Sequence, residues 1–438
     1  MIPLARFASI LLMCSFQASE MLAAQAAATH SGTQNTDLKF VVILSRHGVR
    51  SPTGKPVKYN PYSAAPWPHW DVPPGHLTAH GYQLMKLFGA YDRALLASDG
   101  LVAPTGCADA ARITILADSD QRTRETGEAI AGGMFPGCSV EVHALPEGTN
   151  DPLFHPHRIA DQDRALALAA VEGRIGEDPG NLTAAYRPEL TALDSILAGC
   201  GHSQSADRSR TTIFDVPSSL APGSGSHPAE LHGPLTVASS LSENLLLEYA
   251  EGMTGADLGW GCLNEDSLRN VMQLHTAAAD YTQRTPTIAR MYASNLLDCI
   301  FKALEQHVSG KPVAGAPGKP SDHILFLVGH DTNITTVAGA LGLDWIIDGR
   351  RDDTPPGGAL VFELWRARDS GAYSVRVCYT AQTLRQMRET QALTLATPPV
   401  QVPIFVPGCS RQDMSCAWNA FADSIRDAID PDYVSTKP

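Results

Sequence analysis

The chain has 438 residues, of which 44% are hydrophobic and 18% are charged, values typical of a globular protein with two or three domains. This composition excludes a chain that is disordered as a whole. The 33 Lys and Arg residues against 46 Asp and Glu give a formal net charge of -13, which excludes a basic surface for nucleic acid or anionic lipid. An anionic ligand would therefore need a local cluster of cations.

The first 28 residues are typical of a secretory signal peptide. Arg6 supplies a positive charge, residues 7–16 form an apolar stretch too short to span a bilayer, and small residues at 24–28 offer a cleavage site. A lipoprotein acylated at Cys14 is the alternative, which the bulky Met13 disfavours. No later run of about 18 apolar residues exists, so we expect a soluble protein that is periplasmic or secreted and has no membrane partner.

Cysteine usage agrees with export. Without Cys14, eight cysteines remain, with no CxxC motif and no Cys/His spacing typical of zinc. We expect four disulfides, although eight cysteines allow many pairings. Cys409 and Cys416 are close enough to close a small loop, and Cys107 with Cys138 would bracket one strand-to-helix unit. The pairs that would then remain are Cys200 with Cys262 and Cys299 with Cys378.

The predicted elements begin with a strand. Residues 39–44 form a continuous apolar run, of the kind found in a strand buried on both faces. After a loop rich in Pro and Trp, apolar residues at helical spacing predict a helix over 78–97. Residues 113–117 predict a second strand, and a helical pattern follows it through Ala131.

From about residue 151 the pattern changes. Residues 160–200 and 236–305 are predicted to be helical without clear strands, and the Ser-, Pro- and Gly-rich stretch 203–233 is predicted to be a loop. A third strand is predicted over 323–328, with a helix from about 334 to 341. Further strands are predicted over 359–365 and 373–380.

Strands that alternate with helices at both ends of the chain, with helices between them, predict an α/β fold. We expect a mixed sheet flanked by helices, with an inserted smaller α-helical domain. The expected boundaries are 37–150 and 290–438 for the α/β catalytic domain and 151–289 for the helical cap.

Polar clusters follow three of the predicted strands. They are Arg46 to Arg50, Asp118 to Arg124, and His330 with Asp331. In open α/β sheets, ligands bind beyond the carboxyl ends of the strands. We therefore expect these three clusters to form one site.

The first cluster has the residue types for phosphoryl transfer. The planar guanidinium groups of Arg46 and Arg50 match the oxygens of a phosphate, and His47 between them could attack phosphorus as a nucleophile. The positive charge nearby should lower the pKa of the imidazole, which keeps one ring nitrogen unprotonated in acid. Such a site needs no metal and no cofactor.

The other clusters would complete the reaction. Asp331 is placed to protonate the leaving alkoxide as a general acid, His330 can donate a hydrogen bond to the phosphate, and Arg122 would complete the phosphate clamp. Activity should then peak in acid, because Asp331 must be protonated while His47 stays neutral.

Each cluster by itself has a plainer explanation. Arg46 and His47 could form a surface turn, and His330 with Asp331 could be an ordinary helix start. The sequence contains no GxSxG, GxxxxGK[ST] or HExxH motif, and no GxGxxG after a strand, which argues against serine hydrolases, P-loop enzymes, zincins and dinucleotide enzymes. His155-Pro156-His157 suggests a metal, but a polar loop is favoured because no further ligand stands at the right spacing.

The stretches Arg46-His47-Gly48-Val49-Arg50-Ser51-Pro52 and Gly329-His330-Asp331-Thr332-Asn333 together resemble the paired signature of the histidine acid phosphatases. The resemblance covers nearly the whole mature chain and is closest to the bacterial periplasmic branch of 6-phytases and glucose-1-phosphatases. It implies a phosphoglycerate-mutase-like fold and the hydrolysis of small phosphate monoesters without a cofactor. We also expect a monomer. It also implies roles for the following residues. His47 would be the phosphorylated nucleophile and Asp331 the proton donor, while Arg46, Arg50, Arg122 and His330 would hold the phosphate and Thr53 and Asp118 would line the pocket.

Three positions depart from the phytase pattern. Gly54 stands where phytases of this branch carry a Lys, Tyr292 aligns with a basic residue, and Ser240 aligns with a Met. A hexakisphosphate needs several peripheral cations, so phytate and sugar phosphates both stay open as substrates. Phosphoryl transfer to a second hydroxyl group, as in a mutase of the same superfamily, is the remaining alternative, which export and disulfides disfavour.

Overall fold

The computed structural model describes residues 35–156, 159–199 and 210–435. The expected signal peptide, Cys200 and His157 lie outside the described residues. The strands are β1 (Thr36–Arg46), β2 (Ile113–Ala117), β3 (Val142–His143), β4 (Ser219–Pro222), β5 (Ala229–His232), β6 (Ile324–Gly329), β7 (Ile346–Ile347), β8 (Arg350–Arg351), β9 (Ala359–Ala367), β10 (Tyr373–Ala381), β11 (Val400–Ile404) and β12 (Ser415–Ala417).

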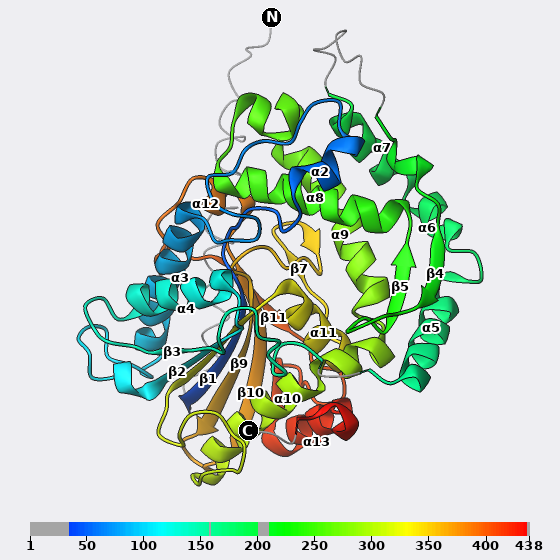
Figure 1. The fold of residues 1–438 in the computed structure, drawn as a ribbon. Coiled ribbons are helices and arrows are strands. Elements are labelled where there is room, and N and C mark those ends of the chain that lie inside the picture. The colour runs from blue at the N-terminus through cyan, green and yellow to red at the C-terminus, as the bar shows by residue number, and fades with distance from the viewer. Residues whose placement is uncertain (1–34, 157–158, 200–209, 436–438) are drawn as a thin grey trace, which may run out of the picture.

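The helices carry the labels of Figure 1. They are α2 (Pro56–Tyr59), α3 (Ala79–Ser98), α4 (Gln121–Met134), α5 (Asp161–Ile175), α6 (Gly180–Ala185), α7 (Arg187–Leu197), α8 (Pro234–Glu251), α9 (Glu265–Thr282), α10 (Pro286–Ser309), α11 (Asp331–Leu341), α12 (Leu384–Arg388) and α13 (Trp418–Ala428). No helix in these ranges is long and apolar enough to cross a membrane.

A mixed sheet forms the centre of the fold. Its strands lie in the order β11-β10-β9-β1-β6-β2-β3, and β12 pairs with β10. The four strands from β1 to β3 in this order run parallel, whereas β9, β10 and β11 pair antiparallel with their neighbours. The α/β class with a mixed sheet is therefore confirmed.

Helices cover both faces of this sheet, which explains the continuous apolar run in β1. Phe40, Val42 and Leu44 pack into a core with α10, α11 and α13, and the alternate residues Val41 and Ile43 pack into a second core with α3 and α4. Successive side chains of a strand point to opposite faces, so a strand buried on both faces is apolar at every position. Figure 1 shows β1 inside the sheet, between these helix layers, and β6 lies next to it in the strand order.

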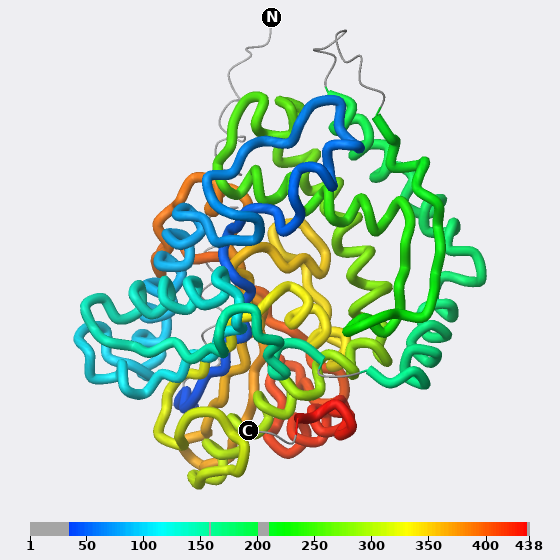
Figure 2. The backbone as a smooth tube through the Cα atoms, in the orientation of Figure 1, coloured from blue at the N-terminus to red at the C-terminus, as the bar shows by residue number. Residues whose placement is uncertain are grey.

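A third apolar core joins the helices of the middle of the chain. Residues of α5, α7, α8 and α9 pack together there, and Ile288 and Met291 of α10 join them. The structure differs from the prediction of a loop over 203–233, because β4 and β5 form an antiparallel hairpin within this stretch. Leu220 and Leu231 of this hairpin pack against the helical core, and this contact over a long sequence distance is what the composition did not reveal. The tube view in Figure 2 shows the hairpin running beside the helices.

The cysteines confirm two expected pairs and correct a third. Cys107 is bonded to Cys138 and Cys409 to Cys416. Cys262 is disulfide-bonded, but its expected partner Cys200 lies outside the described residues. The expected Cys299–Cys378 pair is wrong, because both cysteines are free and buried. They belong to different cores, Cys299 on α10 and Cys378 on β10, so each fills apolar space as a small hydrophobic residue.

Candidate active site

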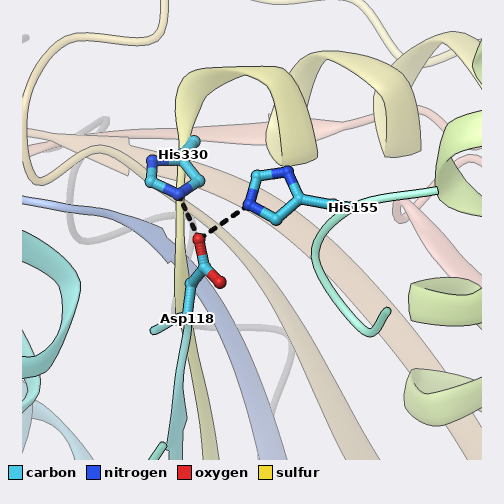
Figure 3. A group of neighbouring side chains, drawn as sticks. All are labelled: Asp118, His155 and His330. Carbon is cyan, nitrogen blue, oxygen red and sulfur yellow. Dashed lines mark hydrogen bonds and ion pairs between the residues drawn. The ribbon is translucent and has the colours of Figure 1, made fainter. Parts of the chain in front are cut away.

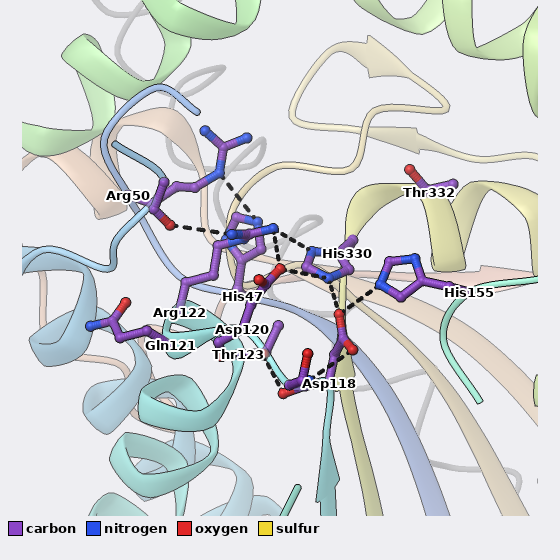
Figure 4. Close-up of polar contacts among 12 residues, drawn as sticks. His47, Arg50, Asp118, Asp120, Gln121, Arg122, Thr123, His155, His330 and Thr332 are labelled. Carbon is purple, nitrogen blue, oxygen red and sulfur yellow. Dashed lines mark hydrogen bonds and ion pairs between the residues drawn. The ribbon is translucent and has the colours of Figure 1, made fainter. Parts of the chain in front are cut away.

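The three polar clusters meet at one edge of the sheet. β6 lies between β1 and β2 and runs parallel to both, with Arg46 opposite Gly329 and Ala117 opposite Val328. The three strands therefore end at the same level, and the segments that follow them converge above the sheet (Figure 4). This arrangement brings His47, Asp118 and His330 together from widely separated parts of the sequence.

His47 is buried at the centre of this cluster, with 2% of its surface exposed. Its Nδ1 donates a hydrogen bond to the Gly48 carbonyl at 2.8 Å, so Nε2 is the nitrogen that carries the free lone pair. The Nε–H of Arg50 lies 3.4 Å from this Nε2. Burial and the charges of nearby arginines, Arg122 first among them, lower the pKa of His47 well below its usual value. The ring is therefore neutral in weak acid and able to act as a nucleophile.

Glu243 on α8 links two of the expected phosphate ligands. Its carboxylate contacts Arg46 and accepts a hydrogen bond from Arg50 Nη2 at 3.1 Å. Burial alone would raise the pKa of Glu243, but the charges of Arg46 and Arg50 hold it below its usual value. Sequence reasoning missed Glu243. An acidic residue within the largely apolar helix α8 was the signal that could have indicated it.

Asp331, the expected proton donor, begins α11 and faces this group. Its Oδ2 lies 3.3 Å from Arg46 Nη2 and 3.8 Å from Nε2 of His275, a residue of α9 that sequence reasoning also missed. Burial would raise the pKa of the Asp331 carboxyl, but the charge of Arg46 and its other cationic neighbours hold it well below the usual range. In the free protein this carboxyl is therefore ionised in weak acid, contrary to the sequence-based expectation of a protonated group.

Arg122 approaches His47 from α4. Its Nη2 pairs with Asp120 at 2.5 Å and lies 3.4 Å from His330 Nδ1 (Figure 4). Its Nη1 lies 3.4 Å from the Gly75 carbonyl. Thr53 is exposed and lies beside Gly75, at the margin of the cluster. The structure thus brings Arg122 to the centre of the site and leaves Thr53 at its edge.

Asp118, His330 and His155 form a chain of hydrogen bonds behind the nucleophile. A single oxygen of Asp118 accepts from His330 Nε2 at 2.5 Å and from His155 Nε2 at 2.9 Å (Figure 3). These two hydrogen bonds hold the pKa of Asp118 below its usual value despite its burial. His155, which the sequence assigned to a polar loop, is therefore part of the site.

A cavity of about 330 Å³ opens above these groups. His47, Arg50, Arg122, His330 and Asp331 line it. Tyr292 and residues 226–229 also line it. The Tyr292 hydroxyl donates to the Ser226 carbonyl at 2.9 Å, so the lining has no cation at position 292.

Two groups of side chains have the donor types of a metal site. They are Asp118 with His155 and His330, and Glu243 with His275 and Asp331, and in each the possible ligand atoms lie within 4.8 Å of one another. The first group is held together by hydrogen bonds, and Arg46 contacts both carboxylates of the second. These protein contacts account for both groups without a metal ion.

The comparisons with known proteins agree with this geometry. Residues 37–174 and 236–380 match the family model of the histidine phosphatase superfamily, branch 2, and the chain belongs to this family. Phytase AppA of Escherichia coli is 36% identical over 405 residues, which cover 90% of this chain and 92% of that protein. A glucose-1-phosphatase of Salmonella typhimurium is 31% identical over 394 residues, which cover 88% of this chain and 90% of that protein.

Solved structures of relatives share the whole fold. The structure of Hafnia alvei phytase in complex with myo-inositol hexakis sulphate matches with a TM-score of 0.83 at 35% identity, covering 92% of this chain and 99% of that one. The phytase of Citrobacter braakii matches with a TM-score of 0.81 at 34% identity, covering 91% and 100%. The protein is accordingly a phosphoric monoester hydrolase of the histidine acid phosphatase type.

Proposed function

We propose that the protein hydrolyses phosphate monoesters by transferring the phosphoryl group to Nε2 of His47. The position of this nitrogen carries the proposal: it has a free lone pair, it is buried, and Arg50, Arg122 and Arg46 surround it. Three guanidinium groups match the charge that spreads over the equatorial oxygens during phosphoryl transfer. His330 is the fourth ligand of the phosphate, and Asp118 holds its ring in place.

Asp331 is the proton donor in this scheme, and its proton arrives with the substrate. A phosphate monoester has a second pKa near about 6, so below that pH it binds as a monoanion. The monoanion delivers a proton to the ionised carboxyl of Asp331, which passes it to the departing oxygen when the P–O bond breaks. The same carboxylate then takes a proton from the water that attacks the phosphohistidine, and inorganic phosphate leaves.

The covalent step has a direct test. Rapid acid quench of the protein with a substrate labelled in the phosphoryl group should leave label on His47, because phosphohistidine forms before water attacks. His47→Ala should lose label and turnover together, by at least about 1,000-fold in kcat. Normal turnover by this variant would exclude the proposed mechanism.

The substrates we propose are phytate and sugar phosphates. The similarity to phytases and glucose-1-phosphatases supports both, and the neutral Tyr292 leaves the cavity lining with few fixed cations. Side-by-side kcat/KM values for phytate, glucose 1-phosphate and phenyl phosphate would rank them. A preference for phenyl phosphate over both others would contradict the proposed substrates.

We further infer a monomeric protein of the periplasm or the secreted fraction. All the proposed catalytic groups come from one chain, and the disulfides favour an oxidising compartment. Residues of α5, α7, α8 and α9 form most of one apolar core, which Tyr59, Trp67 and Leu384 also join. This core supports a division into an α/β catalytic domain, residues 37–150 and 290–438, and a helical cap, residues 151–289.

A further inference from the structure

The position of His155 relative to the cavity is not explained by the transfer of one phosphate. Its Nε2 is held by Asp118 at 2.9 Å, and its ring centroid lies 5.5 Å from that of His330. The side chain is 38% exposed and lines the same cavity as His47. Figure 3 shows the other nitrogen of the ring, Nδ1, on the side away from Asp118. Within the part of the chain that the structure describes, Nδ1 has no hydrogen-bond partner.

The segment that carries His155 is anchored firmly. Phe154 is 2% exposed and packs into the core between the sheet and α10. Its carbonyl accepts a hydrogen bond at 2.6 Å from Nδ2 of Asn333, whose Oδ1 in turn accepts from the backbone N–H of His330 at 2.8 Å. The residues that hold the catalytic end of α11 therefore also fix the position of His155.

The described arginines that line the cavity all lie close to His47, so none of them is free to bind a second anionic group near His155. Among the described lining residues, the arginines are Arg50, which pairs with Glu243, and Arg122, which pairs with Asp120. Both face His47, where the transferred phosphate binds. His155 lies beyond His330, so a group bound there belongs to another part of the substrate.

We propose that His155 binds a second anionic group of the substrate and thereby favours esters that carry more than one phosphate. This inference rests on the proposed function, because it takes the groups around His47 as the site of the transferred phosphate. His155 Nδ1–H would donate a charge-assisted hydrogen bond to a phosphate on a neighbouring carbon of the same molecule. His155 would then supply a cation that Gly54 and Tyr292 do not provide.

The contact should depend on pH. The hydrogen bond that His155 donates to Asp118 is the main reason why the pKa of His155 is raised. Partial burial opposes this rise, and the negative charges of Asp118, Asp120 and Asp151 support it. His330 is the other titratable group that faces the ring, and Asp331, His227 and His47 line the same cavity. Because the pKa is raised, His155 is cationic in acid and loses its charge as the pH rises through that pKa. Binding of the second anionic group should weaken over the same interval.

Two variants test the assignment by kinetics. His155→Gln keeps a hydrogen-bond donor toward Asp118 but has no charge, and at about pH 5 it should raise KM for phytate about tenfold. KM for phenyl phosphate, which has one phosphate, should change by less than about twofold, and any change in kcat that acts through Asp118 should be the same for both esters. His155→Lys should keep the low KM for phytate. His143→Gln removes an exposed imidazole outside the cavity and is the matched control.

A binding measurement does not depend on turnover. By calorimetry, myo-inositol hexakissulfate should bind His155→Gln about tenfold more weakly than the unchanged protein at about pH 5, and this difference should shrink as the pH rises. Equal affinity of the two proteins at about pH 5 would overturn the role of His155. An equal change in KM for phytate and phenyl phosphate would also overturn it, and would show that His155 only positions Asp118 and His330. If the unchanged protein hydrolysed neither ester, the proposed function would fail, while the calorimetry would still decide the role of His155.

Discussion

The state of each titratable residue in the site depends on its neighbours. Burial and arginine charges keep His47 neutral, and two of these arginines, Arg46 and Arg50, help to keep Asp331 ionised. In the proposed mechanism, the nucleophile His47 is thus neutral in weak acid, whereas Asp331 receives its proton from the substrate. Glu243 offsets part of the positive charge of Arg46 and Arg50, so the cluster is stable before phosphate binds.

These protonation states predict an acid optimum. Because the pKa of His47 is lowered from its usual 6.5, the neutral form that attacks phosphorus persists below that pH and is lost only in stronger acid. The alkaline limb should follow the second pKa of the substrate phosphate, near about 6, because the monoanion carries the required proton. The measurement is the pH profile of kcat/KM for two esters whose second pKa values differ. If the alkaline limb fell at the same pH for both esters, the proton would come from a group of the enzyme and not from the substrate.

At the scale of elements, close contacts between helices fix the position of the catalytic loops. α3 and α4 pack together through glycines, because a Cβ on Gly133 would lie 1.9 Å from the Lys86 carbonyl oxygen and one on Gly89 would lie 2.2 Å from that of Ile130. α4 carries Arg122 at its first turn. The distance between these helices therefore influences where Arg122 meets the phosphate.

Two adjacent glycines of α4 provide a matched test. Gly133→Ala should lower the free energy of unfolding by about 1–3 kcal/mol, because the added methyl group forces the helices apart. Gly132→Ala places its methyl group where no atom lies within 4 Å, and should be neutral or stabilise by up to about 1 kcal/mol through helix propensity. Urea unfolding of both variants is the measurement. Similar values for the two would refute the packing argument.

At the scale of the whole molecule, the sheet joins distant segments and the disulfides close loops within them. Cys107–Cys138 encloses β2 and α4 with a sequence separation of 31, and Cys409–Cys416 closes a loop of separation 7 near the end of the sheet. Both constrain the unfolded chain, the first more than the second.

The stability lost on removal of each disulfide should increase with the length of the loop that it closes. Replacing Cys107 and Cys138 by Ser should lower the free energy of unfolding by about 2–4 kcal/mol, and about 1 kcal/mol more than the same change at Cys409 and Cys416. Equilibrium unfolding in urea under oxidising conditions measures both. A larger loss for the shorter loop would show that native packing, rather than chain entropy, sets the cost.

The amino-acid sequence alone predicted the three strands that lead into the candidate site and many of the residues that the structure brings together there. The apolar runs before Arg46, Asp118 and His330 predicted three strands that the structure contains, because a strand buried on both faces has a distinctive local pattern. Glu243, His155 and His275 enter the site from helices or loops far from those strands. Their side chains become neighbours of the nucleophile only when the helices pack over the sheet edge, and no local pattern records that contact.

The cysteines and the β4–β5 hairpin show the same contrast between features that local sequence predicts and features that depend on tertiary packing. Short separations allowed two disulfides to be predicted, whereas the free state of Cys299 and Cys378 follows from their burial in different cores. The β4–β5 hairpin lies in a stretch of weak strand propensity and is held by the helices beside it. Local chemistry thus decided which groups can act on a phosphate, and tertiary packing decided their charge, their partners and the shape of the cavity, because these depend on atoms that are distant in sequence.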